Sequence, residues 1–383
     1  MYNFEYYNPT RLVFGKGTIA RIANLIPKNK KILITYGGGS IFKNGVMDQV
    51  KSALKNHDFT EFGGIEPNPE YETLMKAVKI VKDENIDYLL AVGGGSVLDG
   101  TKFIAAAAVF EGEPWEIMEA FGSNITKAIP LSTILTLPAT GSESNPSAVI
   151  SRREFGKKTP FHNDAVRPDF AILDPETTYS LPLKQTINGI VDAYVHIMEQ
   201  YMVVRKDTPI QDHMAEALLK TLHECGLLLV SNPTDYNLRS QIMYTATLAL
   251  NQQLGLGVDE DWATHMLGHE LTAKYGIDHG ASLSMIMPAL FRVRMNIKEA
   301  KLKTYTKEVL GMSGKIKGED VVQQIEAFFM ALGSPIRLPD YVTEDQIDEL
   351  VANLRLQHPY NIGEDQKIDA KMAKEIYLKA LPE

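Results

Sequence analysis

The chain lacks several features that mark specialised classes of protein. Its 383 residues include one cysteine, Cys225, so no disulfide framework is possible. No apolar run approaches the roughly 20 residues that span a bilayer. The start of the chain has no basic segment followed by an apolar one, as a secretory signal would. We therefore expect neither a disulfide scaffold nor a membrane protein, and the cytoplasm is the expected location.

Long basic runs are also absent. The formal net charge is -9, with 39 Lys and Arg against 48 Asp and Glu. Nucleic acids and anionic membranes are therefore disfavoured as partners, whereas a small neutral substrate is not repelled. The chain is longer than a single core usually supports, which predicts two domains.

The sequence pattern changes near residue 180. Before this point apolar runs alternate with amphipathic stretches, which is typical of an α/β domain. Strands are expected at residues 31–36, 88–92, 132–137 and 170–174, and helices at 70–84 and 97–110. Residues 4–7 and 11–14 predict a small hairpin at the edge of this domain. Later stretches rich in Ala, Leu, Met, Glu and Lys predict helices, for example over 210–229 and 238–254. We thus predict an α/β domain over residues 1–182 and an all-helical domain over 183–383.

Four polar side chains in the second half suggest a metal site. Asp192 and His196 are four residues apart, so a helix places them on one face with Cβ atoms roughly 5–6 Å apart. His265 opens a second helical stretch, and His279 follows a break at Gly276. One carboxylate and three imidazoles are suitable ligands for a divalent metal. The alternative is that each is an ordinary buried group with its own hydrogen-bond partner.

Glycine clusters follow two of the expected strands. Gly93–Ser96 comes directly after strand 88–92 and opens a helix, where backbone amides can bind a pyrophosphate. The alternative is a tight turn with Ser96 and Asp99 as a capping box. Gly37–Ser40 follows strand 31–36 in the same way. The hydroxyl-rich segment 136–145 follows a third strand, and its side chains either bind ribose and phosphate or satisfy a turn.

These motifs, in this order, resemble the iron-containing (type III) alcohol dehydrogenase family, in its branch of NADPH-dependent aldehyde reductases and butanol dehydrogenases. The resemblance extends over the whole chain. It implies a Rossmann-like nucleotide-binding domain, a helical metal-binding domain, the architecture shared with dehydroquinate synthase, and a homodimer. The motifs that carry it are Gly93-Gly-Gly-Ser-x-x-Asp99, Thr140-Gly-Ser-Glu143, Asp192-x-x-x-His196 and His265-x-x-x-His269 followed by His279.

The resemblance also implies a role for each motif residue. It makes Asp192, His196, His265 and His279 the ligands of one Fe²⁺ or Zn²⁺. Spacing alone would pair His265 with His269, but the resemblance makes His269 a neighbour of the metal. His269 and Asp192 are then the candidate catalytic residues, with His269 relaying a proton or orienting nicotinamide. Support of the ligands is the alternative role of His269.

The cofactor residues follow from the same resemblance. It assigns the pyrophosphate to Gly93, Gly94, Gly95 and Ser96, the ribose to Asp99, and the remaining groups to Thr136, Thr140, Ser142, Asn145 and Lys158. A solvated lysine is the alternative for Lys158. NAD-using relatives tend to carry an aspartate after the first strand, where it binds a ribose hydroxyl and repels a 2′-phosphate. This chain has Gly37, Gly38, Gly39 and Ser40 there, which favours NADP(H) over NAD(H).

The predicted function is metal-dependent, NADPH-linked reduction of small to medium aliphatic aldehydes to primary alcohols. One alternative is a dehydroquinate synthase-like lyase, for which we would expect a strongly cationic pocket. The ligands are instead flanked by apolar residues such as Met198, Trp262, Met266 and Leu267. The other alternative is a nucleotide-binding protein without catalytic activity.

Overall fold

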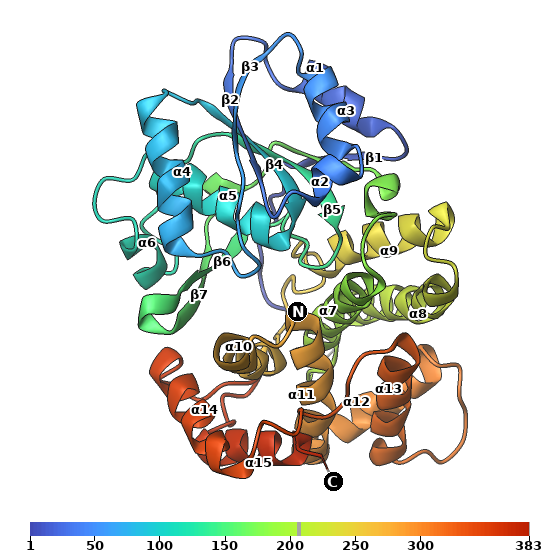
Figure 1. Cartoon of the computed structure of the whole chain (residues 1–383). Coiled ribbons are helices and arrows are strands. Elements are labelled where there is room, and N and C mark those ends of the chain that lie inside the picture. Colours follow the sequence, from blue (N-terminus) through green and yellow to red (C-terminus); the bar gives the residue numbers. More distant parts are fainter. Residues whose placement is uncertain (205–207, 383) are drawn as a thin grey trace. The chain divides into compact units, whose positions relative to one another are not determined.

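A computed structural model of the chain describes residues 1–204 and 208–382 (Figure 1). The chain forms two compact units, one of Tyr7–Leu181 and the other of Met1–Tyr6 together with Pro182–Glu383. We call them the α/β unit and the helical unit. The first six residues thus belong with the helical unit, whereas the sequence pattern had grouped them with the α/β domain.

The α/β unit is built on a parallel sheet with the strand order β1-β8-β5-β4-β2-β3. Apolar residues fill most positions of β2, β4 and β5, as expected for strands covered on both faces. Helices α1 and α3 contribute to the core on one face, and α5 packs against β4. The strands of the sheet are β1 (Arg11–Phe14), β2 (Lys31–Tyr36), β3 (Asp58–Phe62), β4 (Tyr88–Gly94), β5 (Leu131–Leu137) and β8 (Phe170–Leu173).

The remaining elements of this unit include an antiparallel pair of strands, β6 (Ser147–Arg152) and β7 (Lys157–His162). The helices are α1 (Ile22–Leu25), α2 (Ser40–Lys43), α3 (Val46–Ala53), α4 (Tyr71–Asp83), α5 (Gly95–Ala107) and α6 (Glu116–Glu119). The strands predicted at 31–36, 88–92, 132–137 and 170–174 and the helices predicted at 70–84 and 97–110 are therefore confirmed, with shifts of a few residues at their ends.

The predicted N-terminal hairpin is wrong. Strand β1 pairs in parallel with β8, and residues 4–7 form no strand. The backbone N–H of Tyr2 instead donates to the carbonyl of Gly257 at 2.8 Å, within the helical unit. Alternating apolar residues indicate a strand, but its pairing partner lies about 160 residues away in the sequence and cannot be inferred locally.

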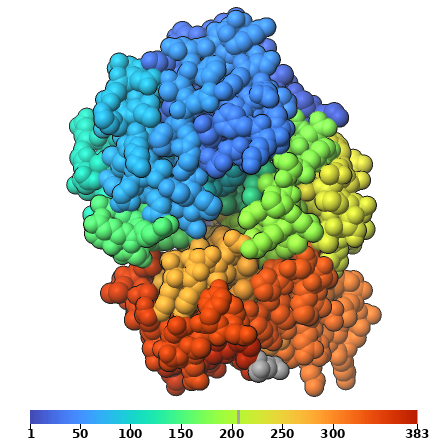
Figure 2. Space-filling model, in the orientation of Figure 1, coloured from blue at the N-terminus to red at the C-terminus, as the bar shows by residue number. Residues whose placement is uncertain are grey.

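The helical unit surrounds its own apolar core, to which α7, α10 and α11 contribute many of the buried residues. Helices α10 and α11 contact each other, α10 also contacts α14, and α11 contacts α15. Figure 2 shows the surface of the C-terminal part of the chain in orange and red. None of the described helices is long and apolar enough to cross a membrane. The helices are α7 (Leu183–Tyr201), α8 (Pro209–Ser231), α9 (Tyr236–Ala249), α10 (Ala263–Tyr275), α11 (His279–Val293), α12 (Met295–Glu308), α13 (Gly318–Leu332), α14 (Glu344–Gln357) and α15 (Ala370–Ala380).

Candidate functional site

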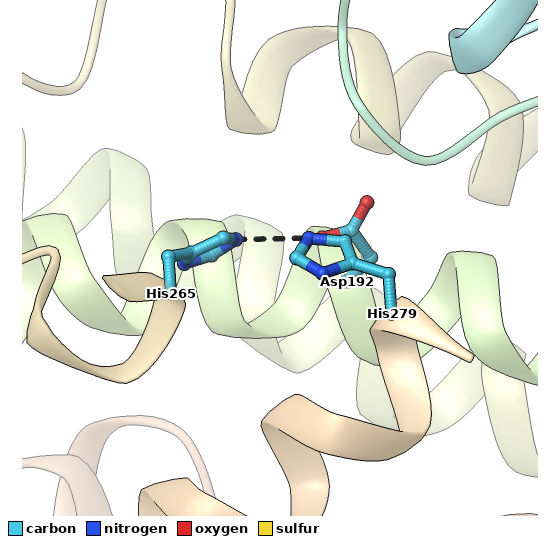
Figure 3. A group of neighbouring side chains, drawn as sticks. All are labelled: Asp192, His265 and His279. Carbon is cyan, nitrogen blue, oxygen red and sulfur yellow. Dashed lines mark ion pairs between the residues drawn. The ribbon is translucent and has the colours of Figure 1, made fainter. Parts of the chain in front are cut away.

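Three helices of the helical unit bring the predicted metal ligands together. Asp192 and His196 lie on α7, His265 lies in the first turn of α10, and His279 is the first residue of α11. The Nε2 atoms of His196, His265 and His279 lie 3.5, 3.5 and 3.4 Å from one atom, Asp192 Oδ1. Figure 3 shows Asp192, His265 and His279 pointing toward one another.

These distances fit a metal ion better than direct hydrogen bonds. Hydrogen bonds between nitrogen and oxygen are usually 2.7–3.2 Å long. For a metal–ligand distance of about 2.1 Å, the ligand atoms of a tetrahedral site lie about 3.4 Å apart. Asp192 Oδ1 and His265 Nε2 are buried and make no hydrogen bond among the described residues. Because buried polar atoms are nearly always partnered, this donor set fits a divalent metal such as Zn²⁺ or Fe²⁺.

His196 lies less centrally than the other three. The ligand atoms of Asp192, His265 and His279 all lie within 4.8 Å of one another, and His196 is not part of this group. Its ring stacks on that of His265, with centroids 4.6 Å apart and an angle of 15° between the planes. All four predicted ligands are therefore neighbours, but only three form the mutually close set.

The charges of the cluster shift its proton equilibria. Burial opposes ionisation of Asp192, but the neighbouring His196 and His279 outweigh it and hold the pKa of Asp192 well below its usual value. Burial likewise opposes protonation of His265, but Glu199 and Asp192 raise its pKa to about 9. The cluster thus strongly attracts positive charge, which a metal cation also supplies.

Two further residues border the cluster. His269 follows His265 by one turn of α10, and its ring centroid lies 5.1 Å from that of His279 and 6.2 Å from that of His265. Glu199, on α7, accepts a hydrogen bond from His265 Nδ1. Glu199 was not predicted from the sequence. The available signal was a lone acid seven residues after Asp192, which is two turns along one helix.

In the α/β unit the three predicted cofactor segments lie together at the carboxyl ends of the parallel strands β2, β4 and β5. Strands β2 and β4 are neighbours, but the chain continues from them toward opposite edges, which is the switch point where open α/β sheets bind ligands. Tyr36 pairs with Val92, so Gly37 and Gly93 follow at the same level. Segment 136–145 continues from β5, the other neighbour of β4.

The turn after β4 leaves the first amides of α5 without a side-chain cap. The helix begins at Gly95, and no side chain caps it. The capping-box alternative is therefore wrong. Ser96 Oγ accepts from the backbone N–H of Asn68 at 3.3 Å, and the carboxylate of Asp99 accepts from Ser142 and Val149. A Cβ at position 95 would lie 2.5 Å from Thr140 Cγ2, so only glycine fits this turn. Uncapped amides at a helix N-terminus are suited to bind an anion.

Several predicted cofactor residues lie in a buried network beneath this edge. Asp99 Oδ1 accepts from Ser142 Oγ at 2.6 Å, and Oδ2 accepts from the backbone N–H of Val149 at 2.9 Å. Lys102 Nζ donates to Ser142 Oγ and to the carbonyl of Asn145, both at 2.8 Å. Asp99, Ser142 and Asn145 thus hold the loop in place from inside.

Lys102 was not predicted from the sequence, although a lysine directly before the apolar run 103–109 was a usable signal. It is fully buried, and burial lowers its pKa to about 7 against the attraction of Asp99 and Glu143. Lys158, on β7, is only 9% exposed, so it is not the solvated lysine of the alternative interpretation. Thr136 is buried as well, whereas Thr140 is partly exposed.

A cavity of about 590 Å³ in the helical unit is separate from the cluster of predicted metal ligands. It is lined by residues near the starts of α7 and α11, and none of the four predicted ligands lines it. Its cationic side chains are already paired, Lys184 with Asp278 at 2.6 Å and Arg337 with Glu326 at 2.5 Å.

The chain is similar to known proteins over its whole length. The iron-containing alcohol dehydrogenase profile matches residues 9–175, and the profile of the C-terminal domain of Fe-containing alcohol dehydrogenases matches residues 186–381. The chain is 49% identical over 383 residues to the NADPH-dependent aldehyde reductase YqhD of Escherichia coli, covering 98% of this chain and 99% of that protein. The crystal structure of YqhD gives a TM-score of 0.97 at 48% identity, covering 99% of each chain. The NADH-dependent butanol dehydrogenase A of Thermotoga maritima gives a TM-score of 0.93 at 34% identity, covering 100% of this chain and 99% of that one. The chain belongs to the iron-containing alcohol dehydrogenase family.

Proposed function

We propose that this protein reduces small to medium aliphatic aldehydes to primary alcohols with NADPH and one divalent metal ion, Fe²⁺ or Zn²⁺. The observation that carries the proposal is the convergence of three imidazole nitrogens on Asp192 Oδ1, at 3.4–3.5 Å. The family to which the chain belongs, and the aldehyde reductase activity named for its relative of 49% identity, support the same reaction.

Asp192, His196, His265 and His279 would hold the ion. When bound there, a divalent ion supplies a Lewis acid that polarises the aldehyde carbonyl, while nicotinamide supplies the hydride. The carbonyl carbon gains the hydride, the oxygen gains a proton, and NADPH becomes NADP⁺. His269 is the proposed proton donor, because its ring borders those of His265 and His279 and an imidazole titrates near neutral pH.

The proposed cofactor site follows the carboxyl edge of β2, β4 and β5. Gly93–Ser96 would bind the pyrophosphate at the uncapped start of α5, and Gly37–Ser40 would take the adenosine 2′-phosphate. A Cβ placed at Gly38 would have no atom within 4 Å, so this position is open. Thr140 and Lys158 are assigned to the rest of the cofactor. We assign Asp99, Ser142 and Asn145 to the support of this loop, since their polar groups are engaged with each other and with Lys102.

The two alternative functions are less well supported. A lyase acting on a phosphorylated, carboxylated substrate needs several cations at its metal site. The ligands are instead bordered by the carboxylate of Glu199, which accepts from His265 Nδ1, and by the ring of Trp262, 5.4 Å from that of His265. A protein without a bound metal has no need for buried ligand atoms that make no hydrogen bond among the described residues, as Asp192 Oδ1 and His265 Nε2 do not.

The decisive experiment is metal replacement followed by a cofactor-oxidation assay. The protein is stripped with a chelator, reloaded separately with Zn²⁺ or Fe²⁺, and supplied with butyraldehyde and either NADPH or NADH. We expect no turnover without metal, recovery with at least one of the two metals, and a strong preference for NADPH. Absence of turnover with both metals would remove the reductase assignment and favour the lyase or the inactive protein.

Cofactor choice is tested separately at Gly38. Gly38→Asp places a carboxylate where the 2′-phosphate is proposed to bind, so KM for NADPH should rise at least tenfold while KM for NADH changes little or falls. Gly38→Asn has nearly the same shape without the charge and serves as the matched control. Equal effects of both variants on NADPH would contradict the proposed phosphate site.

Assembly and location are also proposals. We propose a homodimer, because β1 is an edge strand with an exposed apolar side chain, Phe14 at 43% exposure. A cytoplasmic location is in keeping with the single thiol, Cys225, which packs partly buried on α8.

A further inference from the structure

We propose that Glu199 is a positioning residue of the metal centre. It fixes His265 in the tautomer whose Nε2 faces Asp192, and it anchors the start of α10 that carries His265. This inference rests on the proposed metal site, and it adds a residue to which neither the family resemblance nor the spacing of the ligands assigned a role.

Glu199 is a buried carboxylate whose two oxygens are both used at the start of α10. It is 3% exposed. Oε1 accepts from the backbone N–H of Thr264 at 2.5 Å, and Oε2 accepts from His265 Nδ1 and from the His265 backbone N–H, the latter at 3.3 Å. One side chain from α7 therefore contacts both the backbone and the ring of His265.

Helix α10 has no cap of its own that replaces Glu199. Its N-cap residue, Trp262, adopts a left-handed conformation with φ of 61° and makes no side-chain cap hydrogen bond. The first amides of a helix need acceptors, which a nearby serine, threonine or aspartate usually provides. Asp261 Oδ1 accepts from the N–H of Ala263 at 3.4 Å, and Glu199, from a different helix, accepts from the next two amides. The carbonyl of Glu199 in turn accepts from the N–H of Asp261 at 2.9 Å. The start of α10 is thus fixed directly to α7.

The contact with Nδ1 determines which ring nitrogen of His265 can bind a metal. A carboxylate accepts hydrogen bonds and does not donate them, so Nδ1 must carry the proton. Metal binding requires the other nitrogen to be deprotonated, and Nε2 is the one that faces Asp192 Oδ1, at 3.5 Å. Because α7 also carries Asp192 and His196, this single helix presents two ligands and the group that orients a third.

The test compares Glu199→Gln with Glu216→Gln. A glutamine keeps the size of Glu199 but turns one acceptor into a donor, so either the N–H that meets Oε1 or the two N–H groups that meet Oε2 lose their partner. Glu216 is a suitable control because it is also buried in the helical unit and accepts from Tyr201 of α7 at 2.8 Å, away from the cluster. Zn²⁺ affinity is measured by competition with a chromogenic chelator, and the tautomer of His265 by ¹⁵N NMR of histidine-labelled, zinc-loaded protein.

We expect Glu199→Gln to weaken zinc binding about 10–100-fold and to change the ¹⁵N signals of His265, while Glu216→Gln leaves both unchanged. Unchanged affinity and tautomer in Glu199→Gln would overturn the proposal. If that variant fails to fold, Glu199→Asp replaces it, since a shorter carboxylate keeps the charge but withdraws from Nδ1. Wild-type affinity in Glu199→Asp, with unchanged His265 signals, would likewise overturn it.

His265→Ala separates this inference from the proposed function. If the wild type binds zinc stoichiometrically and His265→Ala does not, the proposed metal site is supported. The results with the Glu199 variants then test only the role of Glu199. A wild-type protein that binds no zinc or iron would overturn the metal site and the role of Glu199 together.

Discussion

His196 is the proposed ligand whose position most needs an experiment. Its Nε2 lies 3.5 Å from Asp192 Oδ1, yet it is outside the mutually close group of three. If His196 is a ligand, His196→Ala should weaken zinc binding more than 100-fold, beyond the 10–100-fold usual for residues that only support ligands. Chelator competition measures this. His223→Ala is the control, because the ring of His223 also stacks on an aromatic neighbour, Phe328, and His223 is not one of the predicted ligands. A loss of about 10–100-fold or less would make His196 a supporting neighbour.

His269 is predicted to act on the proton and not on the metal. Removing a general acid usually costs 10²–10⁴ in rate. We therefore expect His269→Asn to lower kcat by about that factor, with zinc affinity unchanged. Steady-state kinetics and a zinc titration of the same variant check both parts. A parallel loss of zinc affinity would instead make His269 a support of the ligands.

The sequence was informative about the ligands and much less so about the residues that orient them. Asp192 and His196 are four residues apart, so helical geometry alone predicts that they are neighbours. Glu199 meets Thr264 and His265 across 65 and 66 residues, and Lys102 meets Ser142 across 40. Such contacts depend on how whole helices pack, which spacing within one segment does not specify.

At the scale of elements, Lys102 joins α5 to the loop that follows β5. Lys102→Met would leave the buried Asp99 without its cation and several carbonyls without a donor. We expect the free energy of unfolding at pH 7 to fall by about 3–5 kcal/mol, and NADPH to bind more weakly, because the loop loses its internal support. Urea unfolding and a fluorescence titration measure the two effects. Lys79→Met, which removes an exposed lysine on α4, should cost less than about 1 kcal/mol. Equal losses in both variants would contradict the structural role of Lys102.

The same lysine predicts a pH dependence of stability. Burial lowers its pKa to about 7 in the folded protein, whereas an unfolded lysine titrates near 10.4. Between these values the unfolded chain binds one more proton at this residue, so the folded state gains stability as pH rises, by up to about 1.4 kcal/mol per pH unit. The difference in unfolding free energy between wild type and Lys102→Met should therefore grow from about pH 7 to about pH 10. A constant difference would show that Lys102 keeps an ordinary pKa.

Elements whose signal is local were predicted well, and elements that depend on distant partners were not. Strands β2, β4, β5 and β8 are short apolar runs, and each was found near its predicted place. Helix α9 ends at Ala249 instead of continuing to residue 254: Leu250 leaves the helical conformation with φ of −142°, and Gln252 is left-handed with φ of 75°. The order of the sheet, which makes neighbours of the segments after β2, β4 and β5, is a property of the whole unit and was not deduced from the sequence.

At the scale of the whole molecule, the free edge of β1 leads to a prediction about assembly. Within the described part of the chain, no strand pairs with the side of β1 that faces away from β8. Arg11 donates toward the β8 side, to the carbonyl of Asp169, so by alternation the N–H groups of Leu12 and Phe14 face outward. An exposed edge of this kind pairs readily with a second copy. We therefore expect light scattering to give twice the mass of one chain.

Two substitutions test whether this edge is the contact. Leu12→Pro removes an outward N–H without touching the hydrogen bonds to β8, and Phe14→Lys places a charge on the exposed apolar edge. Both should shift the protein toward the monomer while the circular dichroism spectrum stays the same. Phe121→Lys alters another exposed phenylalanine of the α/β unit, 54% exposed, and should leave the dimer intact. A dimer that persists in Leu12→Pro and Phe14→Lys would assign the contact to another surface, and a wild-type monomer would contradict the proposed assembly itself.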